Sequence, residues 1–387
     1  MKRILVAASA DISAFNAIPV HLAGVCGALA AQGYAVDLIA PRPREGRPPA
    51  LDFEAAGIRL RLVPSLSRFG LPNAANLLVV FPVLLAAALA KRARVFYVRF
   101  TVGSFLVVGA LRLAGATVVS EHNGWMADEV RQLGGGPAVI AFARWCQVRD
   151  AALASAVRVV SESLRDRLIA AGADGGKVFV AGNGTDVRRF RPLPRVQALA
   201  EAGLPADGVF TIGLIANLTR WQGGHIAVAS MTRLPEYRLM VVGGGPELES
   251  LKALARKLDV AGRVLFLGPV PVERANAAMN CFDVALAPFP ADRPATSPLK
   301  LRDYAAAGRP VLASDLPQNR ADADRSWARF FRADDADDLA RQVRALQAAP
   351  ETLAAMSVAA RRWAEDHLSW DATARAIIAR LEDSPRP

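Results

Sequence analysis

The residues that decide the fold are the twenty from 238 to 257, which read RLMVVGGGPELESLKALARK. They begin with a short apolar run, continue through three glycines and a proline, and end in a helical segment. The order predicts a buried strand, a tight turn and a helix whose first turn holds Pro246. Glycines let a ligand approach the backbone closely, but a tight turn that contacts no ligand would use the same residues.

The same unit of strand, turn and helix recurs on both sides of this stretch. Short β-branched runs that alternate with helices predict parallel strands that are covered on both faces. The first series of predicted strands is Ile4–Ala8, Ala35–Ala40, Leu60–Val63, Val95–Val98, Thr117–Ser120, Arg158–Ser161 and Lys177–Ala181. The second series is Phe210–Ala216, Arg238–Val242, Val264–Leu267, Val284–Ala287, Pro310–Ala313 and Phe330–Arg332.

Two series in 387 residues predict an α/β protein with two doubly wound, Rossmann-like parallel sheets that face a cleft. The region between the series is rich in Pro and Arg and poor in pattern. We therefore expect an N-terminal domain over 1–182, a linker over 183–207 and a second domain over 208–368. A last helix over 369–387 closes the chain. Phosphate groups favour the helix N-termini that such a cleft exposes.

The composition excludes several classes of protein. Hydrophobic residues make up 52% and charged residues 21%, which is typical of a globular chain and not of a disordered, collagenous or coiled-coil one. The three cysteines, Cys26, Cys146 and Cys281, form neither a disulfide framework nor a zinc pattern. We expect them to be buried thiols in a cytoplasmic protein.

The net charge of +11 is concentrated in the N-terminal half. Residues 1–190 carry 22 basic and 13 acidic side chains, a balance of +9, whereas residues 191–387 carry 25 and 23, a balance of +2. This asymmetry suggests an anionic partner such as a membrane surface, a phosphorylated acceptor or nucleic acid. Because no basic motif interleaved with aromatic residues occurs, we do not expect a nucleic-acid partner.

The longest apolar stretch is Leu77–Ala90, which is interrupted by Pro82. A membrane-spanning helix needs roughly 18–20 apolar residues, so this stretch is too short to span. A buried helix is one interpretation. The other is an interfacial element, because Lys91, Arg92 and Arg94 follow directly and could meet anionic headgroups.

Two familiar ligand motifs are absent or weak. The glycine turn is not G-x-G-x-x-G, since Leu248 stands where the last glycine would be, which argues against a nicotinamide oxidoreductase. Two Asp-x-Asp triplets, 322–324 and 335–337, lie among alternating charges and are interpreted as solvated surface or helix caps. We therefore predict no protein-bound metal.

His122 is one of four histidines and follows a predicted apolar strand. Strand ends in such sheets face the cleft, which makes His122 a candidate site residue. A histidine held in the core or a loop is the alternative.

These motifs together resemble GT-B glycosyltransferases of family 4, the retaining enzymes that use nucleotide sugars. The resemblance covers nearly the whole chain. Its most specific part is 178–192, which contains Asn183-Gly184-Thr185-Asp186 and is similar to the family's interdomain segment. The turns Gly243-Gly244-Gly245-Pro246 and Gly268-Pro269-Val270 are similar to its nucleotide-binding turns, and 297–311 to its donor-site helix. Trp363 to Trp370 resembles its tail, whose last helix crosses back to the N-terminal domain, and the resemblance implies the same for the helix over 369–387.

The chain departs from the family at four positions. Asn217 and Gln222 stand where an Arg and a Lys usually hold the donor diphosphate. The family also has two glutamates. Ala295 stands at the position of the one that touches the donor sugar, and Asp303 stands at the position of the one that holds the ribose. Arg220 and Lys300 could supply the missing charge. These departures leave two readings open, an altered donor or a catalytically inactive relative that binds a sugar nucleotide or assists a partner transferase.

The resemblance implies a metal-independent, retaining transfer of a sugar from a nucleotide diphosphate to a hydroxyl, with UDP- or GDP-sugar as donor and no permanently bound cofactor. It implies a glycan or lipid-linked acceptor and a role in polysaccharide, lipopolysaccharide or glycolipid synthesis. A peripheral position on the inner face of the cytoplasmic membrane is a further expectation. Expected catalytic residues are His122, Lys300 and Arg220. Expected donor residues are Asn217, Gly243, Gly244, Gly245, Gly268, Pro269, Val270, Ser297, Pro298, Leu299, Lys300 and Asp303.

Overall fold

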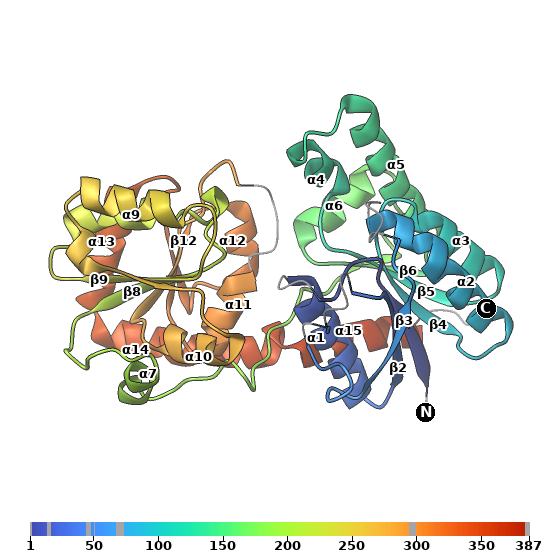
Figure 1. Ribbon diagram of the computed structural model, residues 1–387, viewed down its shortest axis with the longest axis horizontal. Coiled ribbons are helices and arrows are strands. Elements are labelled where there is room, and N and C mark those ends of the chain that lie inside the picture. The colour runs from blue at the N-terminus through green and yellow to red at the C-terminus, as the bar shows by residue number, and fades with distance from the viewer. Residues whose placement is uncertain are drawn as a thin grey trace. The chain divides into compact units, whose positions relative to one another are not determined.

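The structure, a computed structural model, describes residues 2–13, 17–43, 48–49, 51–66, 73–293 and 299–383. It divides into two compact units (Figure 1). The N-terminal unit comprises Met1–Gly184 together with Trp370–Pro387, and the C-terminal unit comprises Thr185–Ser369. Much of the segment expected as a linker packs in the C-terminal unit, where Ala198 and Leu199 of α7 (Arg195–Glu201) are buried.

The N-terminal unit is built on a parallel sheet of seven described strands, in the order β3-β2-β1-β4-β5-β6-β7. The order reverses between β1 and β4, and at such a reversal the carboxyl ends of the two strands form a natural ligand crevice. The strands are β1 (Arg3–Ala7), β2 (Ala35–Pro41), β3 (Ile58–Val63), β4 (Val95–Arg99), β5 (Thr117–His122), β6 (Ala156–Val159) and β7 (Val178–Val180).

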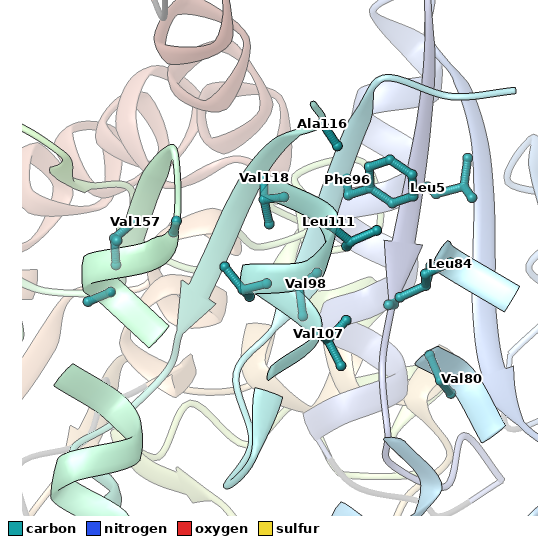
Figure 2. Close-up of a cluster of buried hydrophobic side chains, with 14 of the residues drawn as sticks. Leu5, Val80, Leu84, Phe96, Val98, Val107, Leu111, Ala116, Val118 and Val157 are labelled. Atoms are coloured by element: carbon teal, nitrogen blue, oxygen red, sulfur yellow. The ribbon is translucent and has the colours of Figure 1, made fainter. Parts of the chain in front are cut away.

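Helices cover both faces of this sheet. On one face lie α1 (Ala17–Ala31) and α15 (Trp370–Asp383). On the other lie α2 (Leu77–Leu89), α3 (Ser104–Leu113), α4 (Met126–Gln132), α5 (Pro137–Leu153) and α6 (Glu162–Ala170). Figure 2 shows α2 and α3 pointing one stripe each at the sheet, Val80 and Leu84 from α2 and Val107 and Leu111 from α3. No helix in the described ranges is both long and apolar enough to cross a membrane.

The C-terminal unit repeats the plan with six described parallel strands, in the order β10-β9-β8-β11-β12-β13. Its reversal lies between β8 and β11. The strands are β8 (Thr211–Ile215), β9 (Arg238–Val242), β10 (Val264–Gly268), β11 (Val284–Ala287), β12 (Val311–Ser314) and β13 (Ala328–Phe331). One face packs on α7, α10 (Val272–Asn280), α11 (Leu299–Ala306) and α14 (Pro350–Trp363), and the other on α8 (Gly224–Ser230), α9 (Leu248–Lys257) and α13 (Ala336–Gln347).

The prediction of two parallel Rossmann-like sheets is therefore confirmed, and the errors are at element ends: Pro246, expected in the first turn of a helix, lies in a turn before α9 begins at Leu248. The run Arg158–Ser161 was predicted as a strand, but β6 begins at Ala156 and ends at Val159. Ser161 instead caps α6, because its side chain accepts a hydrogen bond from the Leu164 amide. Serine at the first position of a helix satisfies a free N–H group, which outweighs its place after an apolar run.

The chain leaves and re-enters the N-terminal unit at neighbouring points. On the C-terminal side, the Thr185 amide donates to the Leu368 carbonyl at 2.7 Å, and Thr185 forms a parallel bridge with Ser369. On the N-terminal side, Trp370 packs on α1 at Gly24, where an added Cβ would lie 2.2 Å from the indole. Only glycine at position 24 leaves room for the indole to lie against α1.

Candidate active site

The carboxyl edge of the C-terminal sheet is a set of loops tied together by backbone hydrogen bonds. The Leu218 amide donates to the Gly244 carbonyl at 2.7 Å, and the Glu247 amide donates to the Leu218 carbonyl at 2.9 Å. The Gly243 amide donates to the Gly268 carbonyl at 2.7 Å. The loops that follow β8, β9 and β10 therefore form one continuous backbone surface.

Gly243 and Gly245 are required by this packing. Both have positive φ, 124° and 147°. A Cβ on Gly243 would lie 1.8 Å from the Ala216 carbonyl oxygen, and one on Gly245 would lie 2.6 Å from the Leu218 amide nitrogen. Gly244 differs, because the nearest atom to its added Cβ is 3.6 Å away on Pro269. The packing therefore requires glycine at two positions of the turn, whereas the third has room for a side chain.

The loop after β8 meets the loop after β11 at the reversal point of the sheet. Gly223 has φ 68°, and an added Cβ would lie 1.6 Å from the Pro288 carbonyl oxygen. Arg220 on the first loop pairs with Asp292 on the second at 3.1 Å, and both side chains are more than half exposed. The strand order places these two loops where an α/β sheet binds its ligand.

Two further cations share one aromatic ring at this point. The Lys300 ammonium lies 4.9 Å from the centre of the Phe289 ring, and the Arg293 guanidinium lies 3.7 Å from it. The Lys300 Nζ is buried and has no hydrogen-bond partner among the described residues. Burial, reinforced by Arg293, holds the pKa of Lys300 well below its usual range. Two adjacent cations repel one another, so an anion bound beside Lys300 would be favoured here.

Asp303 lies on α11, one turn after Lys300, and is half-buried. Its Oδ1 accepts a hydrogen bond from the Thr185 hydroxyl at 2.6 Å. Burial raises the pKa of Asp303 to about 6, against the lowering effects of Thr185 and Arg302. The Oδ2 atom makes no hydrogen bond to the described part of the chain, so it is available to a hydroxyl group.

The other expected donor residues differ in how exposed they are. Asn217 is exposed, and the Gln222 Oε1 is buried without a partner among the described residues. Pro269 is exposed, and Gly268, with φ 70°, and Val270 are half-buried. Leu299 begins α11. Ala295, Ser297 and Pro298 lie outside the described residues.

The carboxyl edge of the N-terminal sheet holds a buried charge network that the sequence analysis did not find. Glu121, at the end of β5, is fully buried and is contacted by three basic side chains: His21 at 2.7 Å, Arg99 at 3.2 Å and Arg158 at 3.2 Å. The Tyr97 hydroxyl donates to the same carboxylate at 2.5 Å. Burial alone would raise the pKa of Glu121, but its basic neighbours hold that pKa well below its usual range.

Arg158 connects this network to the end of the N-terminal unit. Its guanidinium donates to the carbonyls of Ala181 and Gly182 at 2.8 and 2.9 Å and to the Asn183 Oδ1 at 2.9 Å. Arg158 is fully buried, and its donors are directed at the oxygens of 181–183, just before the chain enters the C-terminal unit at Thr185. The family-like segment at Asn183 is therefore anchored by β6.

His122 lies on the opposite face of β5 and is also fully buried, with 0% of its surface exposed. Its ring stacks on Phe100 at 4.7 Å. The Nε2 atom lies 3.2 Å from the Asp150 carboxylate, and the Nδ1 atom lies 3.1 Å from the Gln147 amide nitrogen. Both ring nitrogens are thus occupied by α5. In this arrangement His122 presents no free ring nitrogen.

The residues that sequence reasoning missed gave weak local signals. Glu121 and Arg158 are charged residues inside apolar strand patterns, and a charge at that place indicates a buried partner. His21 lies within a helix that is otherwise apolar and small. The triplet 335–337 behaves as expected, since Asp335 caps α13 by accepting from the Asp338 amide, and Asp337 pairs with Arg233 at 2.9 Å.

Comparison with known proteins now places the fold. A family model described as "Glycosyl transferase 4-like domain" matches residues 16–184, and one described as "Glycosyl transferases group 1" matches residues 209–348. D-inositol 3-phosphate glycosyltransferase 2 of Catenulispora acidiphila is 30% identical over 293 residues, which is 67% of each chain. The chain belongs to the GT-B glycosyltransferases of family 4.

Two other comparisons show how far the family likeness extends. A GDP-mannose-dependent mannosyltransferase of Mycolicibacterium smegmatis is 28% identical over 56% of this chain and 59% of its own length. The chain spans about half to six-tenths of the first curated relatives it matches. Sucrose-phosphate synthase from Thermosynechococcus elongatus has the same fold, with a TM-score of 0.79, 17% identity, and coverage of 99% and 98% of the two chains.

Proposed function

We propose that this GT-B family member transfers a sugar from a nucleotide diphosphate donor to a hydroxyl acceptor and retains the anomeric configuration. The observation that carries the proposal is the buried Lys300 ammonium, which lies beside Arg293 at the reversal point of the C-terminal sheet and has no hydrogen-bond partner among the described residues. The family usually places an Arg and a Lys at the positions of Asn217 and Gln222. Here Lys300 and Arg293 would supply the positive charge that a diphosphate leaving group requires.

The proposed mechanism rests on charge stabilisation. The amino end of α11 and the Lys300 ammonium act on the same leaving oxygens, because free N–H groups and a cation both favour developing negative charge. The departing phosphate helps to remove the acceptor proton, so no protein nucleophile and no metal are required. Arg220 contributes less, since Asp292 already pairs with it.

The remaining donor contacts follow from the loops. The Asp303 Oδ2 accepts a hydrogen bond from a ribose hydroxyl. The base of the nucleotide lies against residues 268–270. Gly244, where an added Cβ would lie no closer than 3.6 Å to another atom, is the position of the glycine turn that has room beside it for a ligand. We propose His122 as a positioning residue, because Gln147, which holds its ring, also donates to the Gly124 carbonyl at 2.8 Å and accepts from the Met126 amide at 2.9 Å.

UDP and GDP are the donor nucleotides that we propose to test first. The M. smegmatis relative is named GDP-mannose-dependent. An Anabaena protein of the same fold, HepE, has been solved with UDP; it has a TM-score of 0.76 and 17% identity and covers 99% of this chain and 100% of its own. Several relatives carry names that include inositol 3-phosphate, a phosphorylated acceptor.

We also propose peripheral attachment to an anionic membrane surface on the cytoplasmic side. Leu78 and Leu89 of α2 are 72% and 66% exposed, and the basic residues Lys91, Arg92 and Arg94 that follow are exposed too. Each basic residue near an anionic surface contributes about 1 kcal/mol. Co-sedimentation with phosphatidylserine vesicles at low salt tests this, and absence of binding there would refute it.

The transferase proposal is tested by a panel of UDP-, GDP-, ADP- and dTDP-sugars, scored by thermal stabilisation and then by donor consumption with and without a chelator. Ligand binding raises the unfolding temperature by mass action, so one donor class should stand out. Turnover that survives the chelator supports the proposed mechanism. A donor that binds without being consumed, with any acceptor extract, would instead support the inactive binding protein.

A further inference from the structure

A groove of about 840 Å³ lies between α4, α5 and α6 of the N-terminal unit. It begins at Trp125, three residues after His122 and therefore close to the carboxyl end of β5. Neither the sugar-nucleotide chemistry nor the charge network of Glu121 involves it. The groove is separate from the exposed leucines of α2.

The walls of the groove are apolar. They are formed by Ala127, Pro137, Ile140, Ala141, Val148 and Ala171, with the rings of Trp125 and Trp145. The first half of α5 continues this character outside the groove, since Phe142 is 52% exposed and Val139 is 55% exposed. Solvent-exposed aromatic and aliphatic side chains in one place mark a surface that binds something apolar.

The charged residues of the groove leave an excess of positive charge. Arg131 and Arg167 share the single carboxylate of Asp128, at 2.7 and 2.6 Å. Arg144 is exposed and forms no ion pair with any residue that the structure describes. Three arginines and one aspartate give a local charge of +2 over an apolar floor. An anionic group fits this rim, and guanidinium groups bind phosphate well.

The polar chemistry of the groove argues against a sugar. Among the side chains that the structure describes, the lining contains no Ser, Thr, Asn, Gln or His, and its one carboxylate is already held by two arginines. A sugar ring would therefore find few groups to pair with its hydroxyls, and hydroxyls buried without partners weaken binding. A hydrocarbon chain that carries a phosphate needs only an apolar wall and a cation.

We propose that the groove between α4, α5 and α6 binds a lipid phosphate, the hydrocarbon-and-phosphate part of a lipid-linked acceptor. The role of this lipid phosphate as part of an acceptor rests on the proposed transferase function. The acceptor would then lie beside the segment after β5, which we propose His122 to position. The binding itself does not depend on turnover. The hydrocarbon lies along α5 and the phosphate meets Arg144 and its neighbours.

The test measures binding of dodecyl phosphate to the full chain by calorimetry, below the concentration at which this amphiphile forms micelles. Dodecyl maltoside and inorganic phosphate are the comparison probes. Arg144→Gln should weaken dodecyl phosphate binding about fivefold, the effect of one basic residue on an anionic headgroup. Arg149→Gln is the matched control on the same helix, exposed but outside the groove, and should change the affinity less than twofold.

A second variant tests the hydrocarbon wall. Ala141→Phe, at an exposed position of α5, fills the groove and should weaken dodecyl phosphate binding about tenfold, the effect of displacing roughly two methylene groups. Equal affinity for dodecyl maltoside, equal affinity for inorganic phosphate, or equal effects of the two arginine variants would overturn the proposal. UDP affinity should not change in any variant, so failure here is distinguishable from failure of the donor site.

Discussion

The two sheet edges of this molecule handle charge in opposite ways. At the N-terminal edge, the Glu121 carboxylate is contacted by three basic side chains and a tyrosine, so this buried carboxylate is paired within the unit. At the C-terminal edge, Lys300 and Arg293 lie on the same Phe289 ring, and the Lys300 Nζ has no hydrogen-bond partner among the described residues. From this difference we propose that the C-terminal edge binds an anion, whereas the buried carboxylate of the N-terminal edge already has its partners.

Removing the central carboxylate of the N-terminal edge should have the largest effect on stability. Glu121→Gln leaves buried cations with a neutral partner, and we expect the free energy of unfolding to fall by about 3–5 kcal/mol. Urea unfolding measures it. Glu162→Gln, which removes an exposed partner of Arg165, should cost about 0–1 kcal/mol. Equal losses in the two variants would contradict the buried network.

The same network predicts how stability depends on pH. The folded pKa of Glu121 lies below the unfolded value of about 4.3, so its contribution is present above that value. It is lost as the pH falls through the folded pKa. The acid-induced fall in stability should be smaller in Glu121→Gln than in the wild type.

Lys300→Ala should have the largest effect on turnover. We expect kcat to fall roughly 10²-fold, as when one group that stabilises developing charge is removed. Stability should fall little, because the Nζ is buried with no hydrogen-bond partner among the described residues and its removal relieves a desolvation cost that offsets the lost contact with Phe289. Lys257→Ala, which removes an exposed lysine of α9, is the control and should leave kcat unchanged. A fully active Lys300→Ala variant would mean that the buried cation does not serve the donor.

Asp303 should give a smaller effect that depends on pH. Asp303→Ala should weaken UDP or GDP binding by about 1–3 kcal/mol, the cost of an unpaired polar contact. Because the pKa is raised to about 6, the carboxylate is lost at pH 5, and wild-type affinity should fall between pH 7.5 and pH 5.

The control for this titration is Asp303→Asn, whose affinity should be flat over the same range. The effect of Asp303 on the free energy of unfolding depends on pH in the opposite direction to its effect on donor affinity. A raised folded pKa means that the ligand-free protein loses stability as the pH rises from about 4 through 6. A pH-independent wild-type affinity would remove Asp303 from the ribose site.

Arg220→Ala should have the smallest effect. The guanidinium is 66% exposed and already paired with Asp292, so we expect kcat to fall only about threefold, the equivalent of an exposed pair worth less than 1 kcal/mol. Asp292→Asn should change kcat in the opposite direction or not at all, because it frees the arginine. If kcat falls as much with Arg220→Ala as with Lys300→Ala, the loop after β8 also supplies a catalytic cation, contrary to this prediction.

The two sheets could be predicted from the sequence, but the contacts between buried charged residues could not. Strands such as Arg238–Val242 were predicted within one or two residues because apolar β-branched runs report burial directly. The Glu121 network joins α1, β4, β5 and β6, so no local pattern contains it. His122 was singled out by its place at a strand end, but only the structure shows both ring nitrogens occupied by α5. Arg293 was missed because its partner, the Phe289 ring, is recognised only in space.

The central claim is that the C-terminal edge needs an anion, and the affinity ratio of a nucleoside diphosphate to its nucleoside tests it most directly. Titration calorimetry would measure UDP against uridine, and GDP against guanosine, in the wild type and in the Lys300→Ala/Arg293→Ala variant. We predict a ratio of roughly 10² or more in the wild type, since two charge-assisted contacts at about 1.5–3 kcal/mol each are at stake. The ratio should fall by at least about tenfold in the double variant. An unchanged ratio would contradict the account.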